Sequence, residues 1–505
     1  MDQRVPAVKM RDITKRFGSV VANDKCWLDI YRGEILALLG ENGSGKTTLM
    51  NMLSGIYFPD EGTISIDGKE VVIASPKDAF DLGIGMIHQH FKLVDVFTAA
   101  ENIILGLPGK LDIKEATSKI LSICEKYGFE VDPNQKIYDM SVSQKQTVEI
   151  VKVLYRGADI LILDEPTAVL TPQETDRLFA VLRNMRDDGK AIVIITHKMH
   201  EVEDLSDRVA VLRKGQFTGD MLTKNTNAQE MTNMMVGRPV ELNIHRGDPV
   251  NPKPRIIVEG LTVLDEEGTV KLDDVSFTAS SGEILGIAGI SGCGQKELLE
   301  SIAGLQKVEK GSIRYVEDDG TEEELIGKDP LEIKALGVAL SFVPEDRLGM
   351  GLVGNMDLGN NMMLRSYRNG KGLFTDTKAP YKLAEQMVDF LEIVTPDVQT
   401  PVRKLSGGNV QKVLVGREIS NAPTVLLTAY ATRGLDINSS YLIYDTISSQ
   451  KDRGVAVIYV GEDLDVLVEL CDKILVLCGG KVSGVLDGRT TDKRQVGAMM
   501  TRLGG

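Results

Sequence analysis

A glycine-rich segment near the start of the chain has the residue types and spacing of a phosphate-binding loop. The pattern G-x-x-x-x-G-K-T begins at Gly40 and ends with Lys46 and Thr47, directly after an expected strand at 35–39. Glycines let backbone N–H groups approach phosphate oxygens at a helix start, the lysine reaches the β- and γ-phosphates, and the threonine hydroxyl is a Mg²⁺ ligand. The candidate residues for binding these phosphates are Gly40, Glu41, Asn42, Gly43, Ser44, Gly45, Lys46, Thr47 and Thr48.

Two carboxylates end a later apolar run. Asp164 and Glu165 follow the expected strand 160–163, at the edge of a parallel sheet where a phosphate loop opens. Asp164 is expected to hold Mg²⁺, and Glu165 to position or deprotonate the attacking water, because phosphoryl transfer needs in-line placement and charge neutralisation. A plain helix cap is the alternative interpretation, and the Lys46–Thr47 pair favours the catalytic one.

The chain contains a long internal repeat. GEILALLGENGSG at 33–45 returns as GEILGIAGISGCG at 282–294, an offset of 249 residues. Ser141 and Ser406 are 265 residues apart. Self-similarity over this length indicates duplication of a folding unit of roughly 240 residues. We therefore predict one domain at 1–240, a linker at 241–255 that is rich in proline, and a second domain at 256–505.

Short apolar runs alternate with longer periodic stretches. The runs 191–195 and 209–212 are rich in β-branched residues and leucine, whereas 175–186 has helical periodicity. Buried strands that alternate with helices predict an α/β fold with a mainly parallel sheet in each half.

Composition limits the possible classes of function. The 505 residues are 42% hydrophobic and 26% charged, and the net charge of -15 argues against a broad nucleic-acid-binding face. Five cysteines without metal-type pairing suit a reducing cytoplasm. No segment approaches the roughly 18 apolar residues of a membrane span, so any membrane function would need other chains.

The ordered motifs together resemble the ABC ATPase family. Gln89, the region near Ser141, the Asp164–Glu165 pair and His197 stand in the order of that family's sensing and signature elements. The resemblance implies that Gln89 and His197 sense the γ-phosphate and assist catalysis, that Gln89 also contacts Mg²⁺, and that Phe17 stacks on adenine. It also implies an antiparallel β-subdomain and a helical subdomain in each of two tandem cassettes.

The second half carries a sequence close to the family's L-S-G-G-Q signature. Ser406, Gly407, Gly408 and Asn409 follow Leu405, and a helix N-terminus of this kind would cap the γ-phosphate bound by an opposing cassette. A flexible turn is the alternative. Head-to-tail pairing of cassettes would combine the complete first set of motifs with this signature in one active site.

The second phosphate site has lost its chemical residues. The first signature, at 140–144, also lacks both glycines. We predict one hydrolytic site and one degenerate site. By the fixed offsets, Lys46 corresponds to Gln295, Thr47 to Lys296, Asp164 to Ala429, Glu165 to Tyr430 and His197 to Glu462. Glu345 stands opposite Gln89.

Further motifs resemble the ribose-type branch of importers, which takes up simple sugars and nucleosides. The segments 343–347 and 432–436 carry that resemblance, and 85–94 with Phe97 is similar to nucleoside importers. Ser143 and Ala431 depart from that branch. Nucleosides are the expected solute, and a ribose- or galactose-type monosaccharide is the alternative.

The resemblance also implies partners and a location. Two integral membrane permease subunits and an extracellular or periplasmic nucleoside- or sugar-binding lipoprotein are expected, with no nucleic acid, and the chain would lie peripherally at the cytoplasmic face of the membrane. The stretch 89–100 would receive the permease's coupling helix, unless Phe91 and Phe97 simply fill the helical subdomain. Remote alternatives are a twin-cassette protein of translation or DNA repair and a P-loop kinase.

Overall fold

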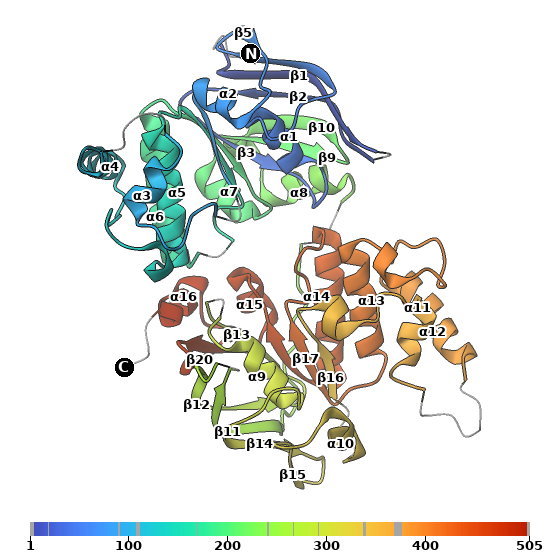
Figure 1. Cartoon of the computed structure of the whole chain (residues 1–505). Helices are drawn as coiled ribbons and strands as arrows, with labels where there is room; N and C mark the ends of the chain where they lie inside the picture. The colour runs from blue at the N-terminus through green and yellow to red at the C-terminus, as the bar shows by residue number, and fades with distance from the viewer. Residues whose placement is uncertain are drawn as a thin grey trace. The chain divides into compact units, whose positions relative to one another are not determined.

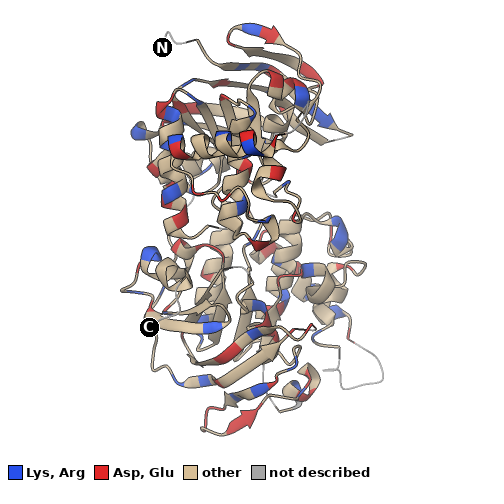
Figure 2. Ribbon diagram, turned by 60° about the vertical axis from the view of Figure 1, so that its left-hand side comes forward, with Lys and Arg blue, Asp and Glu red and all other residues tan. Residues whose placement is uncertain are grey.

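The protein divides into two compact units, Met1–Glu241 and Leu242–Gly505, coloured blue to green and green to red in Figure 1. The computed structural model describes residues 5–18, 20–88, 91–107, 112–168, 170–239, 242–265, 267–290, 292–336, 340–367 and 376–501. Basic and acidic residues are interspersed along the helices and strands of both units (Figure 2). Among the helices in these ranges, none has the length and apolar character needed to cross a bilayer.

The central sheet of the first unit is mainly parallel. Its order is β10-β9-β3-β8-β7-β6, and β10 pairs antiparallel with β9 whereas the other neighbours run parallel. All residues of β3, β7 and β8 are buried, as expected for strands covered on both faces. The strands are β3 (Glu34–Leu39), β6 (Ile84–Ile87), β7 (Ile160–Asp164), β8 (Ala191–Ile195), β9 (Arg208–Arg213) and β10 (Gln216–Leu222).

A second, antiparallel sheet has the order β2-β1-β4-β5. Its inward-facing residues share one apolar core with α1 and one face of the parallel sheet, so this sheet supports the segment between β3 and α1. The strands are β1 (Val8–Phe17), β2 (Val20–Ile30), β4 (Glu61–Ile66) and β5 (Lys69–Val71).

Several helices of the first unit begin at residues whose side chains cap them. Thr98, Ser141 and Thr171 each form a capping box with a glutamate or glutamine three residues later, which satisfies backbone N–H groups that have no partner inside the helix. Helices α3, α4 and α5 share a separate apolar cluster and form the helical subdomain. The helices are α1 (Lys46–Leu53), α2 (Pro76–Asp81), α3 (Ala99–Ile104), α4 (Ile113–Tyr127), η1 (Ile137–Asp139), α5 (Val142–Tyr155), α6 (Pro172–Asp187), α7 (Met199–Leu205), η2 (Thr223–Asn225) and α8 (Ala228–Val236).

The sheets of the second unit repeat the same plan. An antiparallel sheet has the order β12-β11-β14-β15, and the mainly parallel sheet has the order β16-β17-β18-β13-β19-β20. The strands are β11 (Pro254–Leu264), β12 (Val270–Ser280), β13 (Ile284–Ala288), β14 (Lys310–Val316), β15 (Glu322–Glu324), β16 (Leu340–Val343), β17 (Val425–Ala429), β18 (Ala456–Val460), β19 (Lys473–Cys478) and β20 (Lys481–Asp487).

The helices of the second unit follow in the same order, with a π-helical turn, η3 (Arg347–Gly351), after β16. The predicted α/β fold of two tandem cassettes is confirmed by this repeated arrangement. The helices are α9 (Gln295–Ile302), α10 (Pro330–Ala335), α11 (Leu358–Met363), α12 (Lys378–Phe390), η4 (Val402–Lys404), α13 (Gly407–Ile419), α14 (Ile437–Asp452), α15 (Leu464–Leu470) and α16 (Lys493–Thr501).

Residues predicted as a linker make contacts within the second unit. Arg246 donates hydrogen bonds to the carbonyls of Val468 at 2.9 Å and Cys471 at 2.6 Å. The Gly247 carbonyl accepts from Lys451 at 2.6 Å. The chain is thus fastened to the second unit before β11 begins at Pro254.

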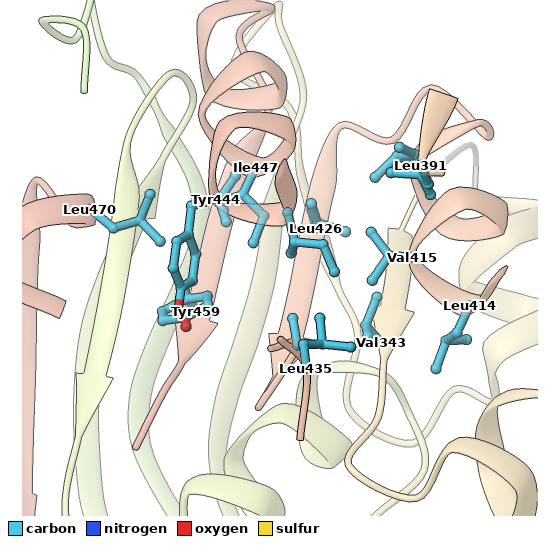
Figure 3. Close-up of a cluster of buried hydrophobic side chains, with 14 of the residues drawn as sticks. Val343, Leu391, Leu414, Val415, Leu426, Leu435, Tyr444, Ile447, Tyr459 and Leu470 are labelled. Atoms are coloured by element: carbon cyan, nitrogen blue, oxygen red, sulfur yellow. The ribbon is translucent and has the colours of Figure 1, made fainter. Parts of the chain in front are cut away.

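One apolar cluster in the second unit joins its sheet to its helical subdomain. Figure 3 shows Val343 at the end of β16, Leu414 and Val415 on α13, and Leu435 pointing toward a common core. Leu391, at the end of α12, belongs to the same cluster. Helix α13 is therefore packed directly on the strands that carry the loops of this unit's site.

Candidate functional site

The loop between β3 and α1 can be formed only with glycine at two positions. A Cβ atom added to Gly40 would lie 2.3 Å from both the Leu212 carbonyl oxygen and the Ser44 hydroxyl. Gly45 has a φ of 94°, and its Cβ would lie 2.4 Å from the Ala22 carbonyl oxygen. The strand-loop-helix arrangement expected for residues 40–48 is thus present, with a backbone path that excludes larger residues at both ends.

Lys46 and Ser44 turn polar groups into this loop. The buried Lys46 ammonium donates to the carbonyls of Gly40 at 2.7 Å and Glu41 at 3.0 Å. Burial lowers the pKa of Lys46, although the carboxylates of Glu165, Asp164 and Glu41 oppose that shift. The Ser44 hydroxyl is buried without a hydrogen-bond partner. A buried cation beside an unsatisfied hydroxyl fits a phosphate group, which would accept hydrogen bonds from both.

Thr47 and Asp164 present oxygen atoms side by side. The Thr47 hydroxyl donates to Asp164 Oδ2 at 3.1 Å, which joins the first turn of α1 to the end of β7. Burial raises the pKa of Asp164 despite the hydrogen bond from Thr47. A hydroxyl and a carboxylate are hard ligands of the kind that Mg²⁺ takes together with substrate phosphates and water, so this pair fits the predicted metal.

Glu165 and His197 meet through the parallel pairing of β7 and β8. Because Asp164 is in register with Ile195, the residues that follow these strands emerge together. His197 Nδ1 lies 2.8 Å from Glu165 Oε1. Glu165 has a φ of 50°, and its N–H donates to the Ile195 carbonyl at 2.9 Å. Left-handed backbone at a residue other than glycine stores strain, which is common at functional sites.

The electrostatics favour an ionised Glu165. Burial alone would raise the pKa of this carboxyl, but the hydrogen bond and charge of His197, together with Lys46 and Lys198, lower it overall. An ionised carboxylate held in one orientation can accept a proton from water.

Phe17 lies at the end of β1, 43% exposed. Its ring meets Tyr57 edge to face, with centroids 5.2 Å apart, and the Lys15 ammonium lies 5.6 Å from its centroid. An exposed aromatic face next to a basic residue suits stacking on a nucleotide base. Tyr57 follows Gly55 and Ile56 and carries no motif signal from which the sequence could predict this role.

Two other neighbours of the site were also missed. His88 follows β6 directly, and burial lowers its pKa while the charge of Asp164 opposes this. Asn23 Nδ2 donates to the Gly45 carbonyl at 3.2 Å and so braces the glycine loop from β2. Gln89, predicted to sense phosphate and bind Mg²⁺, lies outside the described residues.

The predicted signature lies in the second unit at the start of α13. Ser406 is the N-cap, and its hydroxyl accepts from the Asn409 backbone at 3.4 Å and from the Asn409 side chain at 2.9 Å. The side-chain amide oxygen of Asn409, Oδ1, accepts from the Val394 N–H at 2.9 Å. A Cβ on Gly408 would lie 3.3 Å from Leu435. The first-half counterpart, Ser141, likewise caps α5.

The second unit keeps the backbone of the site without its chemical groups. Tyr430 has a φ of 53° and donates its N–H to the Val460 carbonyl at 2.9 Å, as Glu165 does in the first unit. Gln295 is buried and donates to the Ile290 carbonyl at 3.3 Å. Burial and the charges of Glu345 and Glu462 raise the pKa of Tyr430 to about 12, so its phenol is neutral near pH 7.

Known proteins resemble this chain along nearly all of its length. The ABC transporter family model matches residues 24–168 and 272–430. A nucleoside import ATP-binding protein of Lactococcus lactis is 41% identical over 98% of this chain and 97% of its own length. A guanosine import ATP-binding protein of Bacillus subtilis is 40% identical, with the same two coverages. A glucose import ATP-binding protein of Haloferax volcanii is 38% identical over 99% of this chain and 96% of its own length.

These matches agree with the two phosphate loops, the repeated sheet order and the carboxylates at the end of β7. The predicted resemblance to the ABC ATPases is confirmed. The chain belongs to the ABC transporter family, as an ATPase with two ATP-binding cassettes in one polypeptide.

Proposed function

We propose that this chain powers nucleoside import by hydrolysing ATP at one site, which is built on Lys46, Thr47, Asp164, Glu165 and His197. The 2.8 Å pairing of His197 with Glu165 carries the proposal, because it holds a carboxylate next to the buried lysine and the Thr47–Asp164 pair. The remaining candidate residues, Gln89 and Phe17 among them, are proposed to contact the same nucleotide.

Each residue has a distinct task in this mechanism. Lys46 and the backbone N–H groups of residues 40–48 hold the phosphates, and Phe17 stacks on adenine. Thr47 and Asp164 would hold Mg²⁺, which neutralises charge on the phosphates when bound. Glu165 accepts a proton from the attacking water, and His197 keeps that carboxylate oriented. The products are ADP and phosphate.

The second cassette is proposed to be degenerate. Ala429 offers no metal ligand, and the neutral phenol of Tyr430 cannot replace a carboxylate as a base near pH 7. Its Gln295 is neutral where the first cassette has a lysine. The signature of this cassette, 406–409, is complete, and we propose that it serves the nucleotide held at Lys46, so that binding and hydrolysis of ATP drive closure and reopening of the cassettes.

Transport requires partners, which we propose to be two membrane-spanning permease subunits and an external solute-binding lipoprotein. The chain would then act at the cytoplasmic face of the membrane. Nucleosides are supported by two relatives at 41% and 40% identity whose names specify nucleoside or guanosine import. A monosaccharide is the second candidate because the glucose import protein is 38% identical.

Uptake by cells that carry Lys46→Ala tests this proposal. Radiolabelled guanosine, adenosine, uridine, ribose and galactose are compared, with Lys296→Ala as the matched control in the second cassette. Lys296 is an exposed lysine, 3.8 Å from Glu300. We expect Lys46→Ala to abolish nucleoside uptake and Lys296→Ala to leave it within about twofold. Loss limited to a sugar would transfer the chain to monosaccharide import, and unchanged uptake of all five would refute the transport role.

A further inference from the structure

One arginine in the second unit bridges the signature to a neighbouring loop. Arg347 is the first residue of η3, after β16. One of its terminal nitrogens donates to the Gly407 carbonyl at 3.0 Å, and the other donates to the Arg433 carbonyl. Gly407 begins α13 directly after Ser406, so the guanidinium fixes the start of the signature helix against the loop that follows β17.

The bridged loop is fixed in turn by ion pairs. The Arg433 side chain pairs with Glu345, and it pairs with Glu462 at 3.3 Å. By position, Glu345 and Glu462 replace Gln89 and His197 of the first cassette. The loops after β16, β17 and β18 are thus linked by ion pairs within the protein, and two of the three residues replace Gln89 and His197, which are expected to sense the γ-phosphate in the first site. We call Glu345, Arg433 and Glu462 the loop cluster.

Helix α13 is also anchored along its length. Arg417 donates to the Gly351 carbonyl at 2.7 Å, which connects α13 to the last residue of η3. The fully buried Glu418 accepts from the Phe342 N–H at 3.3 Å and from Arg365 at 2.6 Å. Together with the shared apolar cluster in Figure 3, these contacts hold the signature helix α13 firmly against β16 and η3.

The first unit connects the equivalent elements differently. Phe91 stands at the position of Arg347. In the described part of this unit, two hydrogen bonds join α5 to the next residue: Glu149 Oε1 accepts from the Lys92 N–H, and Lys152 donates to the Lys92 carbonyl, both at 3.0 Å. The Ser141 hydroxyl contacts the Ser143 hydroxyl at 3.0 Å. The arginine bridge is therefore a property of the cassette whose signature is complete.

We propose that Arg347 is a positioning residue for ATP hydrolysis at the first site. This role rests on the function proposed above. It means that the second cassette holds its signature, 406–409, in one geometry whether or not a nucleotide is bound at the second cassette's own phosphate loop. The loop cluster holds the loop after β17 in place, as contacts with phosphate would in the first cassette. Arg347 connects that loop to Gly407 and so orients the start of α13. Misplacing a group at a reacting centre by a small distance costs turnover more than binding.

Steady-state ATPase kinetics of the purified full chain test this role. In Arg347→Gln we expect kcat to fall at least about tenfold while KM for ATP stays within about threefold, because the Lys46 loop is untouched. Arg347→Lys should recover only part of the loss, since one ammonium replaces two separate nitrogens of a planar fork. Arg403→Gln is the matched control, an exposed arginine three residues before Ser406, and should retain wild-type kcat.

A second variant and a melting curve separate positioning from misfolding. Arg433→Gln breaks the loop cluster and should also lower kcat. Thermal unfolding should be unchanged in both variants, because the side chains of Arg347 and Arg433 are partly exposed. Wild-type kcat in Arg347→Gln would overturn the positioning role, provided that Lys46→Ala is inactive. If Lys46→Ala also kept wild-type turnover, the proposed site itself would be wrong.

Discussion

Glu165 combines an ionised carboxylate with a strained backbone at the end of β7. Its φ of 50° and the hydrogen bond from His197 hold the side chain in one place. Tyr430 adopts nearly the same φ, 53°, without a carboxylate. The backbone geometry is therefore a feature of the fold in both units, and the two units differ in the side chain that stands there.

Replacing this carboxylate gives a prediction at the residue scale. Glu165→Gln keeps the size and the backbone but cannot accept a proton, and a general base is worth roughly 100-fold or more. We expect ATPase activity to fall by at least that factor while a fluorescent ATP analogue binds with unchanged affinity. The matched variant Asp159→Asn, at an exposed carboxylate just before the same strand, should keep full activity. Appreciable turnover in Glu165→Gln would exclude the assigned base.

The backbone of the loop between β3 and α1 restricts which residue types can occupy it. Gly45 and Gly68 have similar positive φ values, 94° and 79°, but differ in their surroundings. A Cβ on Gly45 would lie 2.6 Å from Asn23 Nδ2, whereas a Cβ on Gly68 meets nothing within 4 Å. Both alanine variants carry the left-handed penalty of roughly 1–2 kcal/mol, and only Gly45→Ala also displaces the loop.

This contrast supplies a prediction at the element scale. Gly45→Ala should weaken ATP binding at least about tenfold, because the loop can no longer direct its N–H groups and Lys46 at one phosphate. Gly68→Ala, in the turn between β4 and β5, should show a smaller loss of thermal stability with unchanged ATP binding. Equilibrium binding and thermal unfolding of both variants check this, and equal ATP affinities would contradict it.

At the scale of the whole molecule, the two units have an aspartate at the same position, but the two side chains differ in how deeply they are buried. Asp207 accepts from the Ile35 N–H and Asp472 from the Ile284 N–H, both at 2.9 Å. Asp472 is 4% exposed and also holds Lys451, which is 1% exposed, at 2.8 Å. Asp207 is 39% exposed and pairs with Arg186. The second unit thus has a buried ion pair where the first unit has a partly exposed one.

Asp472→Ala should therefore destabilise its unit more than Asp207→Ala. Leaving Lys451 buried without its partner costs about 3–5 kcal/mol, whereas losing the exposed carboxylate costs about 1–2 kcal/mol. Hydrogen exchange of the peptides that contain β3 and β13 measures the two units separately in the full chain. Adding Lys451→Met to Asp472→Ala should recover part of the loss. Equal protection losses in β3 and β13 would refute the difference.

The sequence by itself determined the parts that depend on local spacing. The strand-loop-helix around Gly40 and the strand that ends at Asp164 were predicted within two residues, because a buried strand followed by a glycine loop leaves little choice of conformation. The repeat also predicted the second cassette. These features depend on consecutive residues, so they can be predicted without knowing which strands are neighbours.

Only the tertiary structure decided which distant residues meet. Glu165 and His197 are 32 residues apart and come together because β7 and β8 pair in one register. The bridge from Arg347 to Gly407 spans 60 residues, and Arg433 reaches Glu345 across 88. Such contacts depend on strand order and on side-chain packing. Neither leaves a periodic pattern in the sequence, so the support of the signature became visible only in the folded chain.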